Sequence, residues 1–198
     1  MKIGNMLKLG IVLAAYATAA CVMLAFVYAG TVDIIAERAE ADLQAALRDV
    51  FPDADSFEPL DELRSPDSTV TIQSAFKAMK DGAIMGAALR VSRASYSGPI
   101  LTLAGVNANG IITGVRIMAH TDTPGLGANA ASPSFFVDRP NRITFYGQFT
   151  GKHANDPFEV KNDVAVITAS TVTSDAVAAS VKAAASAVNT WLADGGAR

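Results

Sequence analysis

No charged residue occurs between Lys8 and Asp33, and this uncharged run, residues 9–32, constrains the fold more than any other feature of the chain. With a rise of about 1.5 Å per residue, a helix over these ~24 residues is roughly 36 Å long, whereas the hydrocarbon core of a bilayer is ~30 Å thick. The run is therefore long enough to cross a membrane. We expect a short tail at residues 1–8 and a transmembrane helix at residues 9–31.

A cleaved signal peptide is the alternative to a retained anchor. The sequence Val27-Tyr28-Ala29 resembles a small-residue cleavage site. The apolar run, however, is longer than the stretch of about 7–15 residues that a signal peptide needs, so we favour the anchor.

The charges that flank the run give an orientation. Lys2 and Lys8 precede it, while Asp33, Glu37 and Glu40 lie among the residues that follow. Because positive residues stay on the cytoplasmic side, we expect a cytoplasmic N-terminus and a C-terminal domain outside.

Composition narrows the chemistry available to that domain. The only cysteine, Cys21, lies inside the apolar run, so the rest of the chain has neither a disulfide nor a thiolate that holds a metal. The formal net charge of −3 is too mild to indicate a nucleic-acid partner.

Beyond the anchor, the sequence predicts an α+β domain with a mostly antiparallel sheet packed by helices. Residues 32–68 are expected to form a helix over 33–50 and then an acidic surface segment over 53–68, and residues 69–198 to form the main domain. Hydrophobic alternation and turn residues predict strands over 69–76, 83–91, 100–106, 111–119 and 142–149. Helical spacing of apolar residues after position 176 predicts a last helix, which Gly195 ends.

A hydroxyl-rich segment directly precedes this last helix. It contains Thr168, Ser170, Thr171, Thr173 and Ser174. On local physics alone, the segment is a helix start in which Thr173 or Ser174 caps the first amides. A helix N-terminus also offers free amides and a positive dipole end, which suit a phosphate.

Two further turns have residues that suit ligand contact. In the segment from His120 to Gly127, Pro124 and two glycines predict a tight turn with accessible amides, and Leu126 is available to pack on a ring. Asp122 is interpreted as a turn residue and His120 as a structural histidine. Tyr96, before the Gly98-Pro99 turn, is either a stacking residue or a rim residue.

These motifs together resemble the G subunit of the Rnf (also called Rsx) ion-translocating electron-transport complex and, more distantly, the C subunit of the sodium-translocating NADH:quinone reductase. The resemblance covers nearly the whole chain, and the segment from His120 to Gly127 matches the family pattern His-x-Glu/Asp-Thr-Pro-Gly-Leu-Gly. Other matching stretches are the anchor, Tyr96-Ser97-Gly98-Pro99-Ile100, Asn109-Gly110-Ile111, residues 145–152 and the hydroxyl-rich segment.

The resemblance implies an FMN cofactor and its site. In the family, the last Thr of a Ser/Thr-Gly-Ala-Thr motif carries FMN as a phosphoester, and the matching residues here are Thr168-Ala169-Ser170-Thr171. It therefore implies attachment at Thr171, with other FMN-binding residues at Thr168, Ser170, Thr123, Gly125, Leu126, Gly127 and Tyr96. Ala169, Ser170 and Ala165 depart from the family pattern, in which Gly, Ala and Asp stand at these positions.

The implied function is that of a membrane-anchored flavoprotein that carries electrons within an ion-translocating ferredoxin/NAD complex. Its partners are the other membrane subunits and a flavin transferase, and it has neither catalytic acid–base residues nor a metal. It is placed in the bacterial inner membrane as a single-pass protein with its C-terminal domain on the periplasmic side. The motif departures keep an alternative open, an anchored non-redox scaffold subunit without the flavin. A serine hydrolase is disfavoured because no nucleophile-elbow pattern is present.

Overall fold

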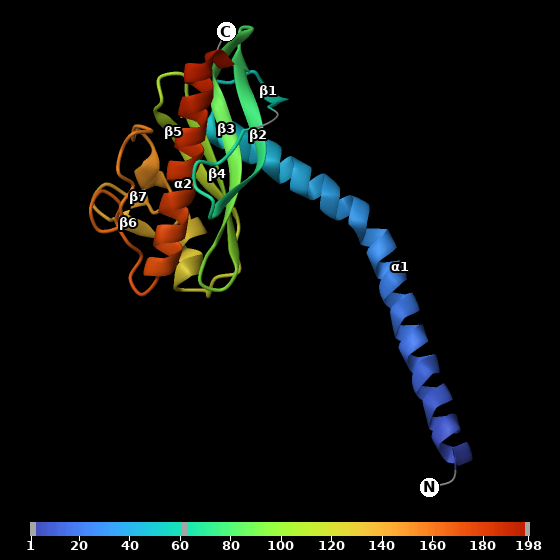
Figure 1. The fold of residues 1–198 in the computed structure, drawn as a ribbon. Coiled ribbons are helices and arrows are strands. Elements are labelled where there is room, and N and C mark those ends of the chain that lie inside the picture. Colours follow the sequence, from blue (N-terminus) through green and yellow to red (C-terminus); the bar gives the residue numbers. More distant parts are fainter. Residues whose placement is uncertain (1–2, 61–62, 197–198) are drawn as a thin grey trace. The chain divides into compact units, whose positions relative to one another are not determined.

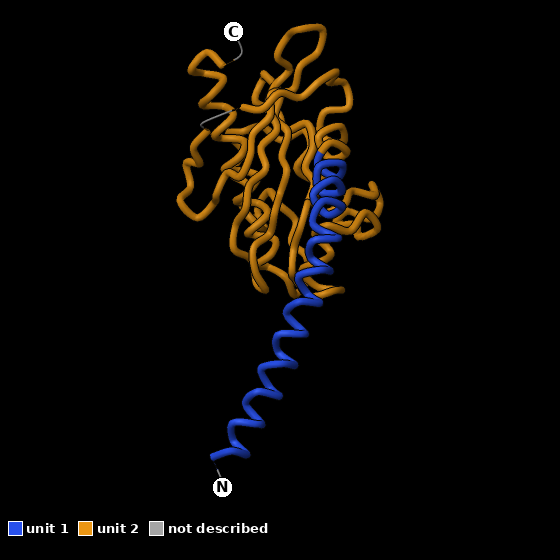
Figure 2. The backbone as a smooth tube through the Cα atoms, turned by 90° about the vertical axis from the view of Figure 1, so that its right-hand side faces the viewer, with its two compact units in different colours: residues 1–43 blue, residues 44–198 orange. Residues whose placement is uncertain are grey.

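The computed structural model of the chain describes residues 3–60 and 63–196. The chain divides into two compact units, residues 1–43 and residues 44–198 (Figure 2). Met1 and Lys2, the first residues of the expected tail, lie outside the described residues.

The apolar run and the helix expected after it form one continuous helix, α1 (Ile3–Val50). Its most apolar 18-residue window has a mean hydropathy of 2.2, and none of that window is buried. Large side chains such as Leu13, Leu24 and Phe26 are exposed, as they are in a segment that faces hydrocarbon. The helix ends at Val50, because Pro52 disfavours the helical conformation of the residue before it.

The second unit contains a five-stranded antiparallel sheet in which sequential strands are neighbours (Figure 1). This confirms the predicted α+β class. Its strands are β1 (Ser56–Pro59), β2 (Val70–Lys80), β3 (Ala83–Ala94), β4 (Pro99–Asn107) and β5 (Ile112–Ala119). Asp81 and Gly82 both have positive φ, 49° and 76°, as a two-residue hairpin turn between β2 and β3 requires.

The segment over 53–68, expected as an irregular surface segment, contains the short strand β1. This strand pairs with β2 from Ser56 to Pro59. Acidic residues and prolines in the segment obscured the strand pattern. Proline has no N–H to donate, but Pro59 is tolerated because it ends an edge strand, where no further strand pairs with it.

The strand predicted over 142–149 is wrong for most of its length. Only β7 (Ile143–Thr144) is extended, and it pairs with β6 (Phe136–Asp138). A 3-10 turn, η2 (Gly147–Phe149), follows and brings Phe145 and Phe149 into edge-to-face contact, with both rings fully buried. In an extended strand, residues four apart share a face but lie about 13 Å from each other, so the contact between these two rings requires a turn, and this tertiary contact overrides the strand pattern.

One face of the sheet packs against α2 (Thr171–Trp191), the helix predicted near the C-terminus. Val177, Val181, Ala184 and Val188 are fully buried against β3 and β4, which confirms the predicted apolar face. Gly195, at φ 92°, lies in the single π turn that ends the helix.

The opposite face of the sheet packs against the end of α1 within the second unit. Leu47, Val50 and Phe51 are buried there. A Cβ on Gly105 would lie 2.9 Å from the Phe51 ring, and one on Gly114 would lie 3.0 Å from the Val50 Cα. The two glycines therefore allow this helix end to approach β4 and β5 closely.

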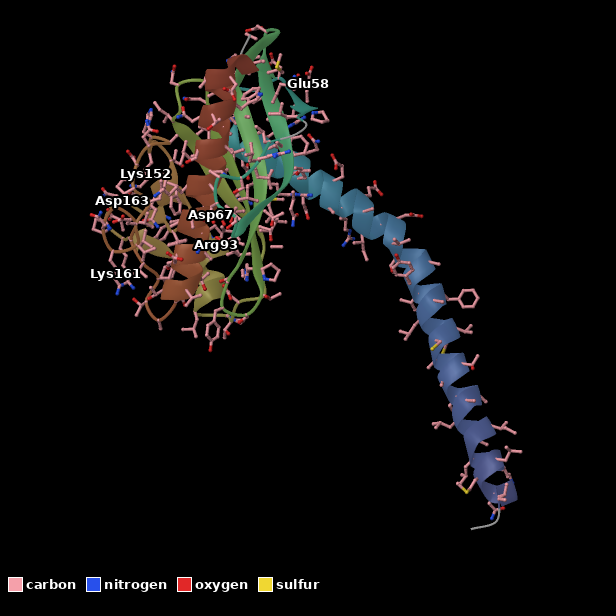
Figure 3. All side chains as sticks on the ribbon, in the orientation of Figure 1. Glu58, Asp67, Arg93, Lys152, Lys161 and Asp163 are labelled. Carbon is pink, nitrogen blue, oxygen red and sulfur yellow. The ribbon has the colours of Figure 1, made fainter. Side chains whose placement is uncertain are left out.

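A largely buried ion pair orders the long connection that leads into α2 (Figure 3). The Asp163 carboxylate accepts hydrogen bonds from Lys152 Nζ at 2.9 Å and from the amides of Phe158 and Glu159 at 3.2 and 2.6 Å. Burial raises the pKa of Asp163, but these hydrogen bonds and the Lys152 charge outweigh it and hold that pKa below its usual value. The connection is thus fixed before the chain reaches the hydroxyl-rich segment.

Candidate functional site

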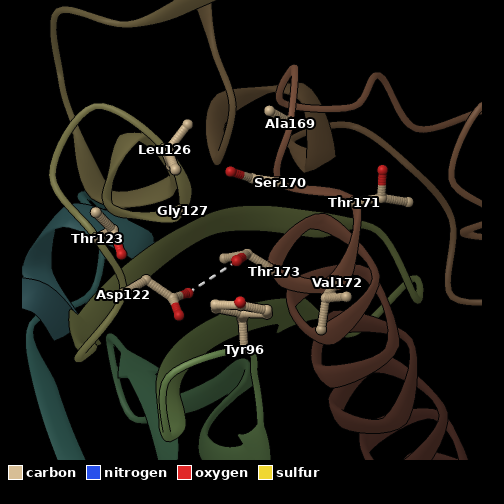
Figure 4. A pocket seen from close by; sticks show the side chains of 10 residues that line it. All are labelled: Tyr96, Asp122, Thr123, Leu126, Gly127, Ala169, Ser170, Thr171, Val172 and Thr173. Carbon is tan, nitrogen blue, oxygen red and sulfur yellow. Dashed lines mark hydrogen bonds between the residues drawn. The ribbon is translucent and has the colours of Figure 1, made fainter.

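Two segments far apart in the sequence form one pocket of about 440 Å³ (Figure 4). One wall is the loop that follows β5, and the other is the start of α2, while Tyr96 reaches in from the β3–β4 turn. The lining residues are Tyr96, Asp122, Thr123, Leu126, Gly127, Ala169, Ser170, Thr171, Val172 and Thr173. A volume of this size is in the range of roughly 300–1,000 Å³ that small-molecule sites occupy.

The pocket brings together most of the residues that the sequence predicted for the site. Those that line it are Tyr96, Thr123, Leu126, Gly127, Ser170 and Thr171. Gly125 is not among them: it makes the turn between Thr123 and Leu126 at φ 80°, and its carbonyl accepts a hydrogen bond from Asn129 Nδ2. Thr168 is exposed and lies outside the lining.

The pocket has an apolar rim. Tyr96, Leu126 and Val172 are 79%, 42% and 54% exposed. Among the described residues of the second unit, the only other large apolar side chain with comparable exposure is Ile111. Exposed apolar surface in this unit is therefore concentrated where a ligand would enter.

The site also contains a residue whose role the sequence did not reveal. Asp122, interpreted as a turn residue, is only 6% exposed. Its carboxylate accepts hydrogen bonds from Thr173 Oγ1 at 2.8 Å, Ser95 Oγ at 2.9 Å and the Ser97 amide at 3.1 Å. It thus joins the β3–β4 turn, its own loop and α2.

The charge state of Asp122 follows from these contacts. Burial raises the pKa of its carboxyl. The hydrogen bonds from Thr173, Ser97 and Ser95 outweigh burial and hold the pKa below its usual value, so the carboxylate is ionised at neutral pH.

Gly127 is required by close packing against this carboxylate. A Cβ there would lie 2.5 Å from Thr173 Oγ1 and 2.8 Å from Asp122 Oδ2. The space that any other side chain would fill is occupied by the Asp122–Thr173 hydrogen bond.

The predicted capping by Thr173 or Ser174 is wrong. The helix begins at Thr171, and Ser170, the residue before it, makes no side-chain cap hydrogen bond. Thr173 donates to Asp122 instead, while Ser174 Oγ accepts from the Ile167 amide and donates to the Ser170 carbonyl. The first amides of α2 are left without a side-chain acceptor.

Thr171 and Ala169, at the start of the helix and just before it, differ in character from those buried hydroxyls. Thr171 is exposed, and its hydroxyl has no hydrogen-bond partner anywhere in the part of the chain that the structure describes. Ala169 has φ 61°, a left-handed conformation that favours glycine. At this position an alanine therefore adopts a backbone conformation that glycine adopts more easily.

Neither histidine lines the pocket. His120 precedes the loop and His153 lies by Ile111. No group of three or more His, Cys, Asp or Glu side chains placed to hold a metal occurs within residues 3–60 and 63–196.

Known proteins match both parts of the chain. A sequence model of the RnfG N-terminal region matches residues 1–50, and one of the FMN-binding domain matches residues 95–186. The G subunit of the ion-translocating oxidoreductase complex of Vibrio cholerae serotype O1 is 30% identical over 192 residues, covering 92% of this chain and 90% of that protein. This chain belongs to the family of G subunits of ion-translocating oxidoreductase complexes. Its relative in Acetobacterium woodii, the G subunit of the Na(+)-translocating ferredoxin:NAD(+) oxidoreductase complex, is 29% identical over 197 residues, covering 88% and 87%.

The fold has a counterpart among solved structures. The crystal structure of Shewanella oneidensis NqrC matches with a TM-score of 0.50 at 16% identity, over 74% of this chain and 88% of that one. This likeness confirms the predicted fold. The match to the FMN-binding domain bears out FMN as the predicted cofactor. Every residue that lines the pocket lies within the matched range 95–186.

Proposed function

We propose that this chain is a membrane-anchored electron carrier that holds FMN through a phosphoester on Thr171. The observation that carries the proposal is the position of Thr171. It lines the same pocket as the loop from Asp122 to Gly127, at an uncapped helix start, with a hydroxyl that has no partner among the described residues.

The pocket residues suit the two chemically different parts of FMN. The rim of Tyr96, Leu126 and Val172 offers apolar surface for a planar ring system. The first amides of α2 have no side-chain acceptor and stand at the positive end of the helix dipole. A phosphate on Thr171 would lie beside those amides and satisfy them.

The neighbouring hydroxyls are less suited to attachment. Those of Thr173 and Ser174 are buried and already hydrogen-bonded. Ser170 is buried as well, and Thr168 lies outside the pocket lining. Among the hydroxyl-bearing residues of this segment, only Thr171 is both exposed and part of the pocket lining.

Attachment needs an activated flavin nucleotide and an outside catalyst, because a neutral threonine hydroxyl is a weak nucleophile. The Thr171 oxygen would form a bond to the flavin-bearing phosphorus and lose its proton. The bond between that phosphorus and its leaving group would break. We therefore include a flavin transferase and a flavin dinucleotide-type donor in the proposal.

The attached group supplies electron transfer, and the protein supplies its position and surroundings. A covalent link keeps the cofactor with the protein outside the cytoplasm. The related proteins are named as subunits of ion-translocating oxidoreductase complexes, one of them a ferredoxin:NAD(+) oxidoreductase. We place this chain in such a complex, with electron partners on its other membrane subunits.

The charges around the apolar run support an orientation. Lys8 lies before the candidate span in α1, and Asp33, Glu37 and Glu40 follow it. By the positive-inside rule, the FMN-binding domain would lie on the periplasmic side of a retained single-pass anchor.

The test is to express the full chain with its flavin transferase and record in-gel fluorescence after denaturing electrophoresis, with intact mass measured in parallel. The proposal predicts a fluorescent band and the added mass of one FMN phosphoester. A dark band at the unmodified mass contradicts it and favours the non-redox scaffold, with Ala165, Ala169 and Ser170 as the departures to examine first.

A further inference from the structure

We propose that Asp122 is a positioning residue for flavin attachment: through its hydrogen bond to Thr173 it fixes the first turn of α2 and thereby the position of Thr171 in the pocket wall. The inference rests on the attachment at Thr171 proposed above. It assigns Asp122 no contact with the reacting atoms.

The geometry links the two walls of the pocket at one carboxylate. Thr173, two residues after Thr171 in the same helical turn, donates to Asp122 Oδ2 at 2.8 Å (Figure 4). The same oxygen accepts from Ser95 Oγ at 2.9 Å, and Oδ1 accepts from the Ser97 amide at 3.1 Å. The start of α2 is thereby tied to the turn that follows β3.

Burial makes this link strong. Thr173 is only 1% exposed and Asp122 only 6%. A hydrogen bond to an ionised group is stronger than a neutral one, and low local polarity strengthens it further.

Gly127 gives independent support, because it leaves the space that the link occupies. A Cβ at this position would collide with both partners, Thr173 Oγ1 and the Asp122 side chain. The last glycine of the Thr-Pro-Gly-Leu-Gly run thus serves the Asp122–Thr173 hydrogen bond, although its own φ is not positive.

Other contacts at this helix start hold it less firmly to the opposite wall. Ser174 bonds only to Ile167 and Ser170, which belong to the same segment. Arg93 reaches the Asp175 carboxylate at 3.3 Å and donates to the Asp175 carbonyl at 3.2 Å, but Arg93 lies on β3 and so joins the helix to the sheet rather than to the loop after β5. The Asp122–Thr173 bond is the buried tie across the pocket.

Position matters because the hydroxyl must meet the phosphorus in the transferase at a defined distance and angle. A displacement of about 1 Å at a reacting group lowers such rates by up to ~100-fold. Ala169 and Ser170 add no side-chain cap that would fix Thr171 if the tie were lost.

The experiment measures the initial rate of flavin incorporation into the full chain in detergent, with purified transferase and a flavin dinucleotide donor. Thr173→Val removes the donor at nearly constant volume and should slow incorporation at least ~10-fold. Thr173→Ser keeps the donor and should restore the rate to within about twofold of wild type.

The matched control is Thr102→Val, the same substitution at a fully buried hydroxyl of β4 that has no hydrogen-bond partner among the described residues. It should label at the wild-type rate. Circular dichroism establishes that every compared variant is folded, so that a difference in rate reports position rather than unfolding.

A folded Thr173→Val variant that labels at the wild-type rate overturns the proposal. If that variant does not fold, Thr173→Ala takes its place: it removes the same donor with a smaller side chain, and should slow labelling about threefold or more. A folded Thr173→Ala variant that labels at the wild-type rate would equally contradict the proposal. Failure of the proposed attachment at Thr171 gives a different result: the wild-type chain shows no flavin fluorescence, or the Thr171→Ala variant incorporates flavin as well as the wild type.

Discussion

The two walls of the pocket differ in how completely their polar groups are satisfied. In the wall after β5, the Asp122 carboxylate has three hydrogen-bond donors, and Gly127 packs against it without spare room. In the wall at the start of α2, the amides lack a side-chain cap, Ala169 has a left-handed backbone and the Thr171 hydroxyl has no partner within the described chain. Native helices usually satisfy such groups. In our proposal the first wall fixes the position of the helix start and the second binds the flavin phosphate, and we call them the positioning wall and the receiving wall.

The largest expected effect is on the receiving wall. Thr171→Ala should abolish covalent flavin completely, because no other hydroxyl in the segment is both exposed and part of the pocket. Since the side chain is exposed and makes no hydrogen bond in the described chain, the free energy of unfolding should change by less than about 0.5 kcal/mol. In-gel fluorescence and urea unfolding measure the two effects. Thr168→Ala is the control, and loss of flavin in this variant would contradict the assignment.

The next largest effect is expected when the Asp122 carboxylate is removed from the positioning wall. Asp122→Ala would leave the buried Thr173 hydroxyl, and the less buried donors on Ser95 and Ser97, without their acceptor, and should lower the free energy of unfolding by about 1–3 kcal/mol. Urea unfolding followed by the fluorescence of Trp191, the only tryptophan, measures it.

Asp138→Ala is the matched control, since that carboxylate is on the surface and bonds only to nearby Asn141. If both substitutions destabilise the chain equally, Asp122 has no special structural role.

Lowering the pH should destabilise both the positioning wall and the connection before α2. The pKa values of Asp122 and Asp163 are lowered in the folded chain, so the unfolded chain takes up protons first as the pH falls. Their contribution to stability is complete above the ordinary aspartate pKa of about 3.9 and is lost as the pH falls further through the folded values.

Urea midpoints measured from pH 6 to pH 3 test this expectation. In the Asp163→Asn variant the urea midpoint should fall less steeply at the acid end of this range, because residue 163 then has no carboxylate that takes up a proton. An unchanged slope would show that Asp163 does not contribute to the acid sensitivity.

The smallest effect concerns the backbone of the receiving wall. Ala169→Gly should raise the free energy of unfolding by about 0.5–1 kcal/mol, because a left-handed alanine is strained by about 1–2 kcal/mol and the extra freedom of glycine in the unfolded chain offsets part of the gain. Thermal unfolding of the two chains decides it. A lower melting temperature for the glycine variant would mean that residue 169 is not strained.

The sequence predicted those parts of the molecule that depend on local pattern. The uncharged run indicated α1, alternation and turn residues located β2 to β5, and the apolar spacing of Val177, Val181 and Val188 gave α2 its buried face. Motif resemblance selected most of the residues that the pocket brings together.

What the sequence missed depends on contacts between distant residues. Asp122 and Thr173 are 51 positions apart, and no local signal joins a turn aspartate to a helix hydroxyl. The acidic residue of the His-x-Asp-Thr-Pro pattern was the only hint of that link. Phe145 and Phe149 likewise lie in a turn that brings their rings into contact in the core, and alternation along the sequence does not distinguish this turn from a strand, in which both residues would also share one face.

One measurement tests the central claim most directly: tryptic peptide mapping of the chain expressed with its flavin transferase. Cleavage after Lys161 and Lys182 releases one peptide that contains the whole hydroxyl-rich segment. The account predicts one FMN phosphoester on this peptide, with fragment ions that place it on Thr171. An unmodified peptide, or a flavin on Thr168, Ser170 or Thr173, would contradict it.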